Sequence, residues 1–125
     1  MKNCATPYWN EDHSAYAVLV SPGFGAGWSS WNDKELAYDS AIVEYYLAHY
    51  DNLEWKEQID SYGDNEVKNA AIDFFKSEGY NFVYLGGLCD CMIEWVPSGK
   101  AWRIEEYDGA ERIVYEEDYE WTCFK

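Results

Sequence analysis

The spacing of the apolar residues changes at Gly79, and this change constrains the fold more than any other feature of the chain. Before Gly79, in residues 33–50 and 64–79, apolar side chains recur at the spacing of helices. Downstream of it they alternate with polar ones, as they do in half-buried strands. Helices followed by consecutive strands predict an α+β fold. Because 125 residues is an ordinary size for one domain, we expect residues 1–125 to form a single acidic α+β domain.

One strand and two helices are expected before this change. Residues 16–20 are a short apolar run with β-branched members, which is typical of a buried strand. Residues 33–50 keep their apolar residues at helical spacing behind an Asn-Asp pair that can cap a helix. A second helix is expected from about residue 64 to a C-cap at Gly79. The stretch between the two helices suggests a short helix around residues 53–59.

The second half of the chain predicts an antiparallel meander of three to five strands, with the helices packed on one face. The expected strands are residues 82–85, 89–96, 101–107, 111–115 and, as an edge strand, 119–124. Gly86-Gly87 would join the first two strands in a hairpin, and Asp108-Gly109 is a strong signal for another hairpin.

The chain carries 24 acidic and nine basic residues, for a formal net charge of −15, and 19% of its residues are aromatic. Disordered acidic segments have few aromatic residues, so this charge is expected on a folded body. The acidic excess is concentrated in two stretches: it is −8 over residues 32–79 and −5 over residues 101–125. Two interpretations stay open: the charge keeps an aromatic-rich protein soluble, or it attracts a basic partner.

The C-terminal stretch favours the second interpretation, because its acids are interleaved with Tyr and Trp, which are typical interface anchors. A row of carboxylates can also imitate the regular negative charge of duplex DNA. The expected function is that of a non-enzymatic protein whose acidic, DNA-mimic-like surface binds a basic, nucleic-acid-handling host protein. The predicted partner-binding residues are Glu105, Glu106, Tyr107, Asp108, Glu111, Tyr115, Glu116, Glu117, Asp118, Tyr119 and Glu120.

Residues 21–32 are rich in Gly, Ser and Trp and are expected to form a loop between a strand and a helix. A P-loop would require Lys where Trp28 stands, and the glycines lack the spacing of the dinucleotide-binding fingerprint. One interpretation is a structural turn whose Trp side chains cover the core. The alternative function is a small-ligand or peptide-binding module built on this loop. Its candidate residues are Phe24, Gly25, Gly27, Trp28 and Trp31.

No combination of residues predicts catalysis, a cofactor or a metal site. The serines of the loop lack the nucleophile elbow of serine hydrolases. Cys89 and Cys91 would need the distant Cys4 and Cys123 to bind zinc, and a Cys-x-Cys pair on a strand is a weak zinc signal. We expect this pair to pack as small apolar residues. A hydrolase that uses acidic residues with a divalent cation is the remaining alternative.

Four segments of the chain point to a known group of proteins: residues 25–32 (GAGWSSWN), 84–87 (YLGG), 93–97 (IEWVP) and 103–109 (RIEEYDG). Together they resemble a group of small acidic proteins of unassigned function encoded by bacteriophages and prophages. The resemblance covers most of the chain and carries over no functional residue. It implies a phage accessory protein and, by analogy with other small acidic phage proteins, an inhibitor of a host CRISPR or restriction nuclease.

No stretch approaches the ~20 apolar residues of a membrane-spanning helix, and the N-terminal residues show no apolar signal core. A cytoplasmic location in the host cell is therefore expected, without membrane contact and without direct binding to nucleic acid. The sequence leaves the oligomeric state open.

Overall fold

The computed structural model describes residues 6–23, 27–51, 66–80, 83–85 and 87–116. Its helices and strands are β1 (Ala15–Val20), α1 (Ser40–His49), α3 (Glu66–Ser77), β2 (Met92–Pro97), β3 (Trp102–Tyr107) and β4 (Ala110–Tyr115). Short 3-10 helices cover Ser29–Trp31, Lys34–Ala37 and Leu88–Asp90. The described chain thus mixes helices and strands, in agreement with the predicted α+β class.

β1 and β2 form a two-stranded antiparallel sheet, although they lie far apart in the chain. The register places Ala15 opposite Pro97 and Val20 opposite Met92. The pairing therefore joins the first strand of the chain to a strand from its second half.

The hairpin predicted between residues 82–85 and 89–96 is wrong. Residues 83–85 are not in a strand, and a 3-10 helix, Leu88–Asp90, occupies the start of the second predicted strand. An alternating pattern identifies a strand without identifying its partner. β2 instead pairs with β1 at all six of its positions.

β3 and β4 form a second two-stranded antiparallel sheet, joined by a tight turn. Both turn residues have positive φ angles, 49° for Asp108 and 87° for Gly109, as a type I′ turn requires. The hairpin predicted here is confirmed. Within the described residues β2 does not pair with β3, so two separate sheets replace the predicted meander of three to five strands. The predicted edge strand at residues 119–124 lies outside the described residues.

The helix predicted for residues 33–50 is interrupted. A 3-10 helix covers Lys34–Ala37, and α1 begins only at Ser40, because Asp39 has an extended backbone with φ −61° and ψ 131°. The N-terminal segment holds this position. The Asp39 carboxylate accepts the Thr6 N–H at 3.3 Å, and the Ser40 N–H donates to the Thr6 carbonyl at 2.6 Å. A tertiary contact therefore outweighs the local helical spacing.

α3 agrees with the prediction. Ala71 and Phe75 on its inner side are buried in the core. Gly79, with φ 95°, follows the helix in the left-handed conformation that glycine adopts at helix C-caps. The short helix predicted around residues 53–59 lies outside the described residues.

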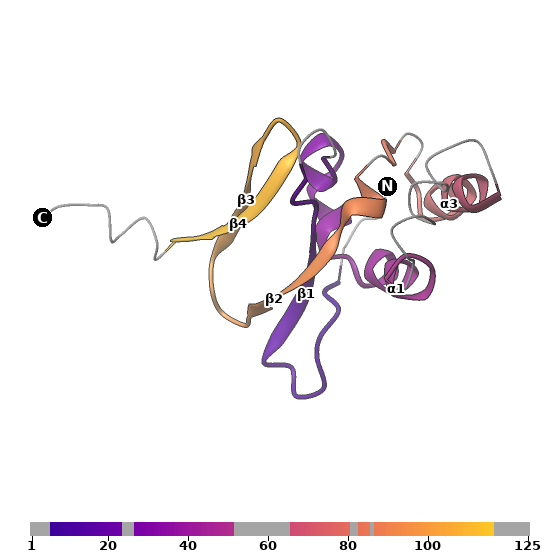
Figure 1. Cartoon of the computed structure of the whole chain (residues 1–125). Helices are drawn as coiled ribbons and strands as arrows, with labels where there is room; N and C mark the ends of the chain where they lie inside the picture. The colour runs from indigo at the N-terminus through magenta and orange to yellow at the C-terminus, as the bar shows by residue number, and fades with distance from the viewer. Residues whose placement is uncertain (1–5, 24–26, 52–65, 81–82, 86, 117–125) are drawn as a thin grey trace, which may run out of the picture.

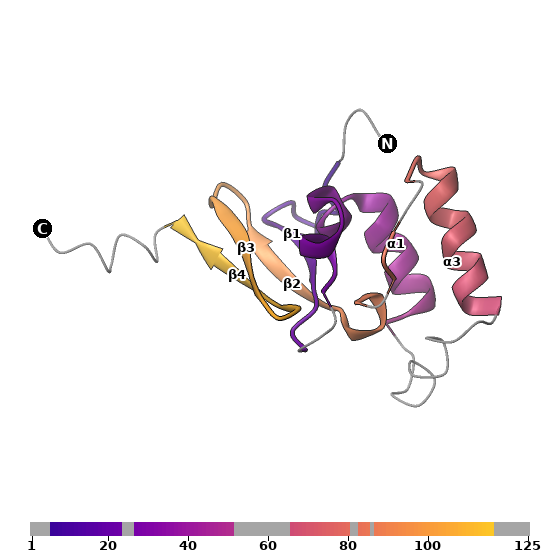
Figure 2. The ribbon, with the colours of Figure 1, turned by 90° about the horizontal axis from the view of Figure 1, so that it is seen from above.

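β1 lies between two core clusters. Its Ala17 and Leu19 pack with α1 and α3, whereas Val18 and Val20 pack with the β3–β4 hairpin. Figures 1 and 2 show this arrangement: α1 and α3 lie on one side of the β1–β2 sheet, and the hairpin lies on the other. Both faces of β1 are covered, which explains why its residues form a continuous apolar run.

Candidate functional site

One buried carboxylate, that of Glu111 on β4, joins the loop after β1 to the β3–β4 hairpin. Glu111 is 4% exposed. Its carboxylate accepts the backbone N–H groups of Ser21 (3.0 Å), Trp28 (2.9 Å) and Ser30 (2.9 Å), and also the Ser30 hydroxyl. Hydrogen bonds to a charged acceptor are stronger than neutral ones. The two regions that the sequence offered as alternative sites therefore form one connected structure.

This placement corrects the prediction that Glu111 presents its charge to a partner. Side chains alternate between the two faces of a strand, and Glu111 lies on the same face as Ile113 and Tyr115, which pack against the core. A buried carboxylate requires hydrogen-bond donors, and the backbone of the loop supplies them. The two-residue spacing from Glu111 to Ile113 is the signal in the sequence that could have shown this.

Asp90 is a second carboxylate that holds the loop, and sequence reasoning did not single it out. It accepts the Ser21 hydroxyl at 2.8 Å and the Gly23 N–H at 2.7 Å. A Cβ on Gly23 would lie only 2.8 Å from the Asp90 carboxylate, so a larger residue there would displace the carboxylate from this position. Asp90 binds the first part of the loop, and Glu111 binds both its start and its end.

The outer face of the hairpin is not a uniform row of acids. Glu105 accepts hydrogen bonds from Arg103 and Arg112, each at 2.9 Å. These two arginines are part of the same two-stranded sheet, so much of the charge of Glu105 is neutralised locally. Because alternation sends Glu111 inward, the described hairpin does not gather its predicted carboxylates on one face.

The remaining predicted contact residues of the hairpin have different surroundings. Tyr107 is 77% exposed at the tip, and Asp108 and Glu116 are also exposed. Tyr115 is half-buried and donates its hydroxyl to Glu94 at 3.2 Å. Four predicted residues lie outside the described ones: Glu117, Asp118, Tyr119 and Glu120.

The two described tryptophans of the loop differ in burial. Trp28 is fully buried; its indole N–H donates to the Leu36 carbonyl at 3.1 Å and its ring centroid lies 5.8 Å from that of Phe75. It packs in the core and offers no surface to a ligand. Trp31 is 42% exposed and covers Gly27, where a Cβ would lie 2.4 Å from the indole ring. Two further candidates, Phe24 and Gly25, lie outside the described residues.

Trp31 connects the loop to the tip of the hairpin. Its indole N–H donates to Glu106 at 3.2 Å, and its ring centroid lies 5.4 Å from that of Tyr84, which is 45% exposed. Glu106 also accepts the Gly109 N–H at 2.7 Å. We call Trp31, Tyr84 and Glu106 the aromatic–acidic face.

A groove of about 610 Å³ adjoins this face. Trp31, Tyr84, Phe75 and Tyr80 are among the residues that line it. Asn32 fixes the rim, because its side chain donates to the Tyr84 carbonyl at 3.0 Å and accepts the Tyr84 N–H at 2.8 Å. The exposed rings are thus held next to a concave apolar surface.

A separate cavity of about 560 Å³ lies between the start of β3 and the segment that contains the first two 3-10 helices. Its aromatic lining consists of Tyr16, Tyr38 and Trp102, and its basic lining consists of Lys34 and Arg103. No residue of this aromatic lining was singled out from the sequence.

Among the described residues, no cluster of three or more His, Cys, Asp or Glu side chains is placed to bind a metal ion. Cys91 is a free thiol buried in the core, and its carbonyl accepts the Tyr46 hydroxyl at 2.6 Å. Within the described chain, no helix has the length and apolar character needed to cross a membrane. No family model, curated protein or solved structure matches the chain.

Proposed function

We propose that the protein is a non-enzymatic binding protein that holds a basic segment of a partner protein on its aromatic–acidic face. The observation that carries this proposal is the joined arrangement of Trp31, Tyr84 and Glu106. The rings of Trp31 and Tyr84 are partly exposed rather than buried in the core. The Glu106 carboxylate accepts the indole N–H of Trp31. Trp and Tyr are enriched among the residues that dominate binding energy at interfaces.

The chemistry of this face suits an arginine or lysine side chain. A guanidinium or ammonium group can lie over the exposed ring of Trp31 or Tyr84 in a cation–π contact, which contributes about 0.5–2 kcal/mol. Its N–H groups can then donate to the carboxylate of Glu106. The adjoining groove can receive an apolar side chain of the same partner segment.

The net charge of −15 supports a basic partner at longer range. A charge of this size attracts an oppositely charged protein and raises the association rate, with a strong dependence on salt. On the resemblance to phage proteins, the partner would be a nucleic-acid-handling host protein such as a CRISPR or restriction nuclease. The protein would then be a cytoplasmic inhibitor that competes with DNA for a basic surface.

Fluorescence anisotropy with a labelled arginine-rich peptide tests the proposal, and a peptide with glutamate in place of arginine is the control ligand. We expect Trp31→Ala and Glu106→Gln each to weaken binding by about tenfold. The matched control is Glu44→Gln, which removes the same charge from an exposed position on α1 and should change the affinity little. If all three variants bind like the wild type, or if both Glu→Gln variants weaken binding equally while Trp31→Ala does not, the proposed face is wrong.

A further inference from the structure

The cavity beside β3 differs in charge from the rest of the molecule. The chain has 24 acidic and nine basic residues, yet no acidic residue lines this cavity, whereas Lys34 and Arg103 both do. Lys34 forms no ion pair with any other described residue. Arg103 is held at the cavity by its hydrogen bond to Glu105 at 2.9 Å. Because Arg103 is already paired with Glu105, Lys34 supplies the positive charge of this concave site that no described carboxylate neutralises.

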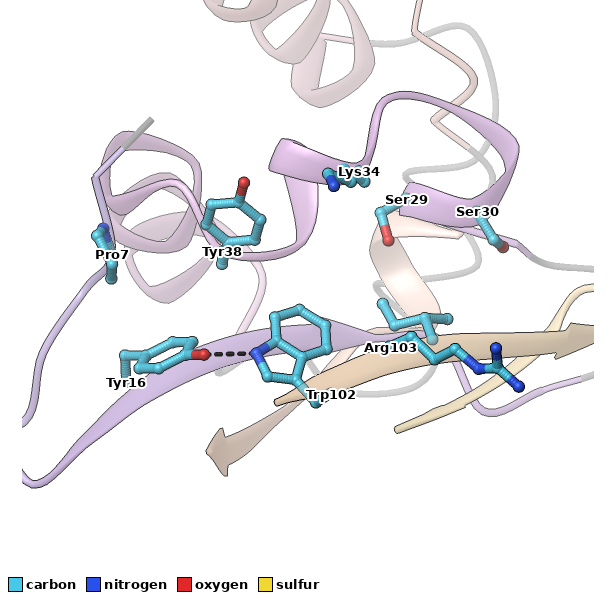
Figure 3. A pocket seen from close by; sticks show the side chains of 9 residues that line it. Pro7, Tyr16, Ser29, Ser30, Lys34, Tyr38, Trp102 and Arg103 are labelled. Carbon is cyan, nitrogen blue, oxygen red and sulfur yellow. Dashed lines mark hydrogen bonds between the residues drawn. The ribbon is translucent and has the colours of Figure 1, made fainter. Parts of the chain in front are cut away.

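The aromatic lining is already fixed by contacts among its own members. The Trp102 indole N–H donates to the Tyr16 hydroxyl. The Tyr38 ring meets the Trp102 ring edge-on, with centroids 6.2 Å apart and planes at 88°. Figure 3 shows Tyr16 and Trp102 along one wall, and Tyr38 and Lys34 along the opposite wall. A ligand would meet rings that are already positioned, which lowers the entropic cost of binding.

The size of the cavity fits a small molecule. Its volume of about 560 Å³ lies within the ~300–1,000 Å³ typical of ligand pockets, which combine an apolar lining with a few polar groups. The polar groups here include the two basic side chains and the hydroxyl of Ser29, which lies at the same end of the cavity as Arg103 (Figure 3). Fixed rings favour a planar apolar group, and basic side chains favour an anion.

We propose that this cavity binds a small molecule that combines a planar ring with an anionic group. The ring packs against Trp102 and Tyr16, and Lys34 attracts the anion. A carboxylate and a phosphate share this chemistry. The site is independent of the proposed partner-binding function, because it uses no residue of the aromatic–acidic face.

Isothermal titration calorimetry with defined probes tests the site. Indole-3-acetate is the carboxylate probe and phenyl phosphate is the phosphate probe. Indole-3-acetamide and tryptamine present the same indole ring without charge and with a positive charge. We expect at least one anionic probe to bind, and indole-3-acetamide and tryptamine to bind about tenfold or more weakly than indole-3-acetate, because hydrogen bonds to a charged group are the stronger ones. The tighter of the two anionic probes identifies the preferred anion.

Two matched variants locate the binding. Lys34→Gln removes an exposed charge from the cavity and should weaken anion binding by about tenfold. Lys76→Gln removes the same charge from α3, outside this cavity, and should leave the affinity unchanged. In NMR spectra, the indole N–H signal of Trp102, assigned by its loss in Trp102→Phe, should shift on titration. The proposal is overturned if neither anionic probe binds, if indole-3-acetate binds but no more tightly than indole-3-acetamide and tryptamine, or if Lys34→Gln and Lys76→Gln behave alike.

Discussion

Replacement of Glu111 by alanine tests whether this buried carboxylate holds the loop to the hairpin. The substitution removes the acceptor for the backbone N–H groups of Ser21, Trp28 and Ser30. A buried donor that loses its acceptor costs about 1–3 kcal/mol, so the three groups together set an upper bound of roughly 9 kcal/mol. Water entering the opened loop replaces part of these bonds. We therefore expect a loss of about 3–5 kcal/mol in the free energy of unfolding, a large part of the ~5–15 kcal/mol typical of a domain.

Urea titration followed by tryptophan fluorescence measures this free energy. Glu111→Gln keeps one carbonyl oxygen as an acceptor and should lose about half as much. The matched control is Glu116→Ala, which removes an exposed carboxylate just after β4 and should change stability by less than about 0.5 kcal/mol. Hydrogen exchange at the Trp28 and Ser30 amides reports on the loop itself and should become faster in Glu111→Ala.

The reasoning is refuted if Glu111→Ala matches Glu116→Ala in unfolding free energy and leaves the exchange of the loop amides unchanged. Faster exchange with little change in global stability would still show that the carboxylate holds the loop. The loss would then lie in local opening of the loop rather than in unfolding of the whole domain.

Three further substitutions test other contacts. Gly27→Ala places a Cβ 2.4 Å from the Trp31 ring, and we expect it to displace the indole and cost about 1–3 kcal/mol in urea unfolding. Gly109→Ala puts a side chain at a φ of 87° and should cost about 1–2 kcal/mol in the same assay. Burial raises the pKa of Tyr46 from 10.0 to about 12, so above pH 10 the folded state keeps a proton that the unfolded state releases. Stability should fall as the pH rises through this window, by at most about 2–3 kcal/mol because solvent screens part of the effect, and Tyr46→Phe should lack this part of the decline.

Each of these predictions has a control or a contrary outcome. Tyr107→Phe removes the hydroxyl of a tyrosine that is 77% exposed and should keep the alkaline decline of the wild type. If Tyr46→Phe keeps it as well, burial of that hydroxyl is not its cause. If Gly27→Ala leaves the indole N–H NMR signal of Trp31 unchanged, the steric argument for Gly27 is wrong. If Gly109→Ala leaves the unfolding free energy unchanged, the argument for Gly109 is wrong.

The parts of the fold that depend on neighbouring residues could be predicted from the sequence. The Asp108-Gly109 turn and the glycine C-cap at Gly79 follow from backbone angles that few other residues adopt. The partner of β2 could not be predicted, because alternation determines which side chains share a face and not which strand lies beside them. The break before α1 was also hidden, because it depends on Thr6 meeting Asp39 across the fold.

The sequence predicted the candidate site only in part, because it does not show which side chains are buried or paired. Counting carboxylates treats each one as a surface charge, whereas the structure buries Asp39 and Glu111 and pairs Glu105 with two arginines. The sequence left open whether the tryptophans of the loop cover the core or bind a ligand, and only the fold separates buried Trp28 from exposed Trp31. The cavity at Trp102 gave no signal in the sequence, because its lining comes from segments that meet only in three dimensions.

The bond from Ser21 to Glu111 spans 90 positions of the chain, and this separation has a consequence during synthesis. A ribosome releases the chain from its N-terminus onward, so β1 emerges long before β2 and β4 exist to cover it. For that interval an apolar strand with open edges is available to neighbouring nascent chains. The stretch that emerges next, residues 32–79, carries a charge of −8, which makes unfinished chains repel one another. On this argument, the acidity of residues 32–79 should lower aggregation of the chain before it has folded.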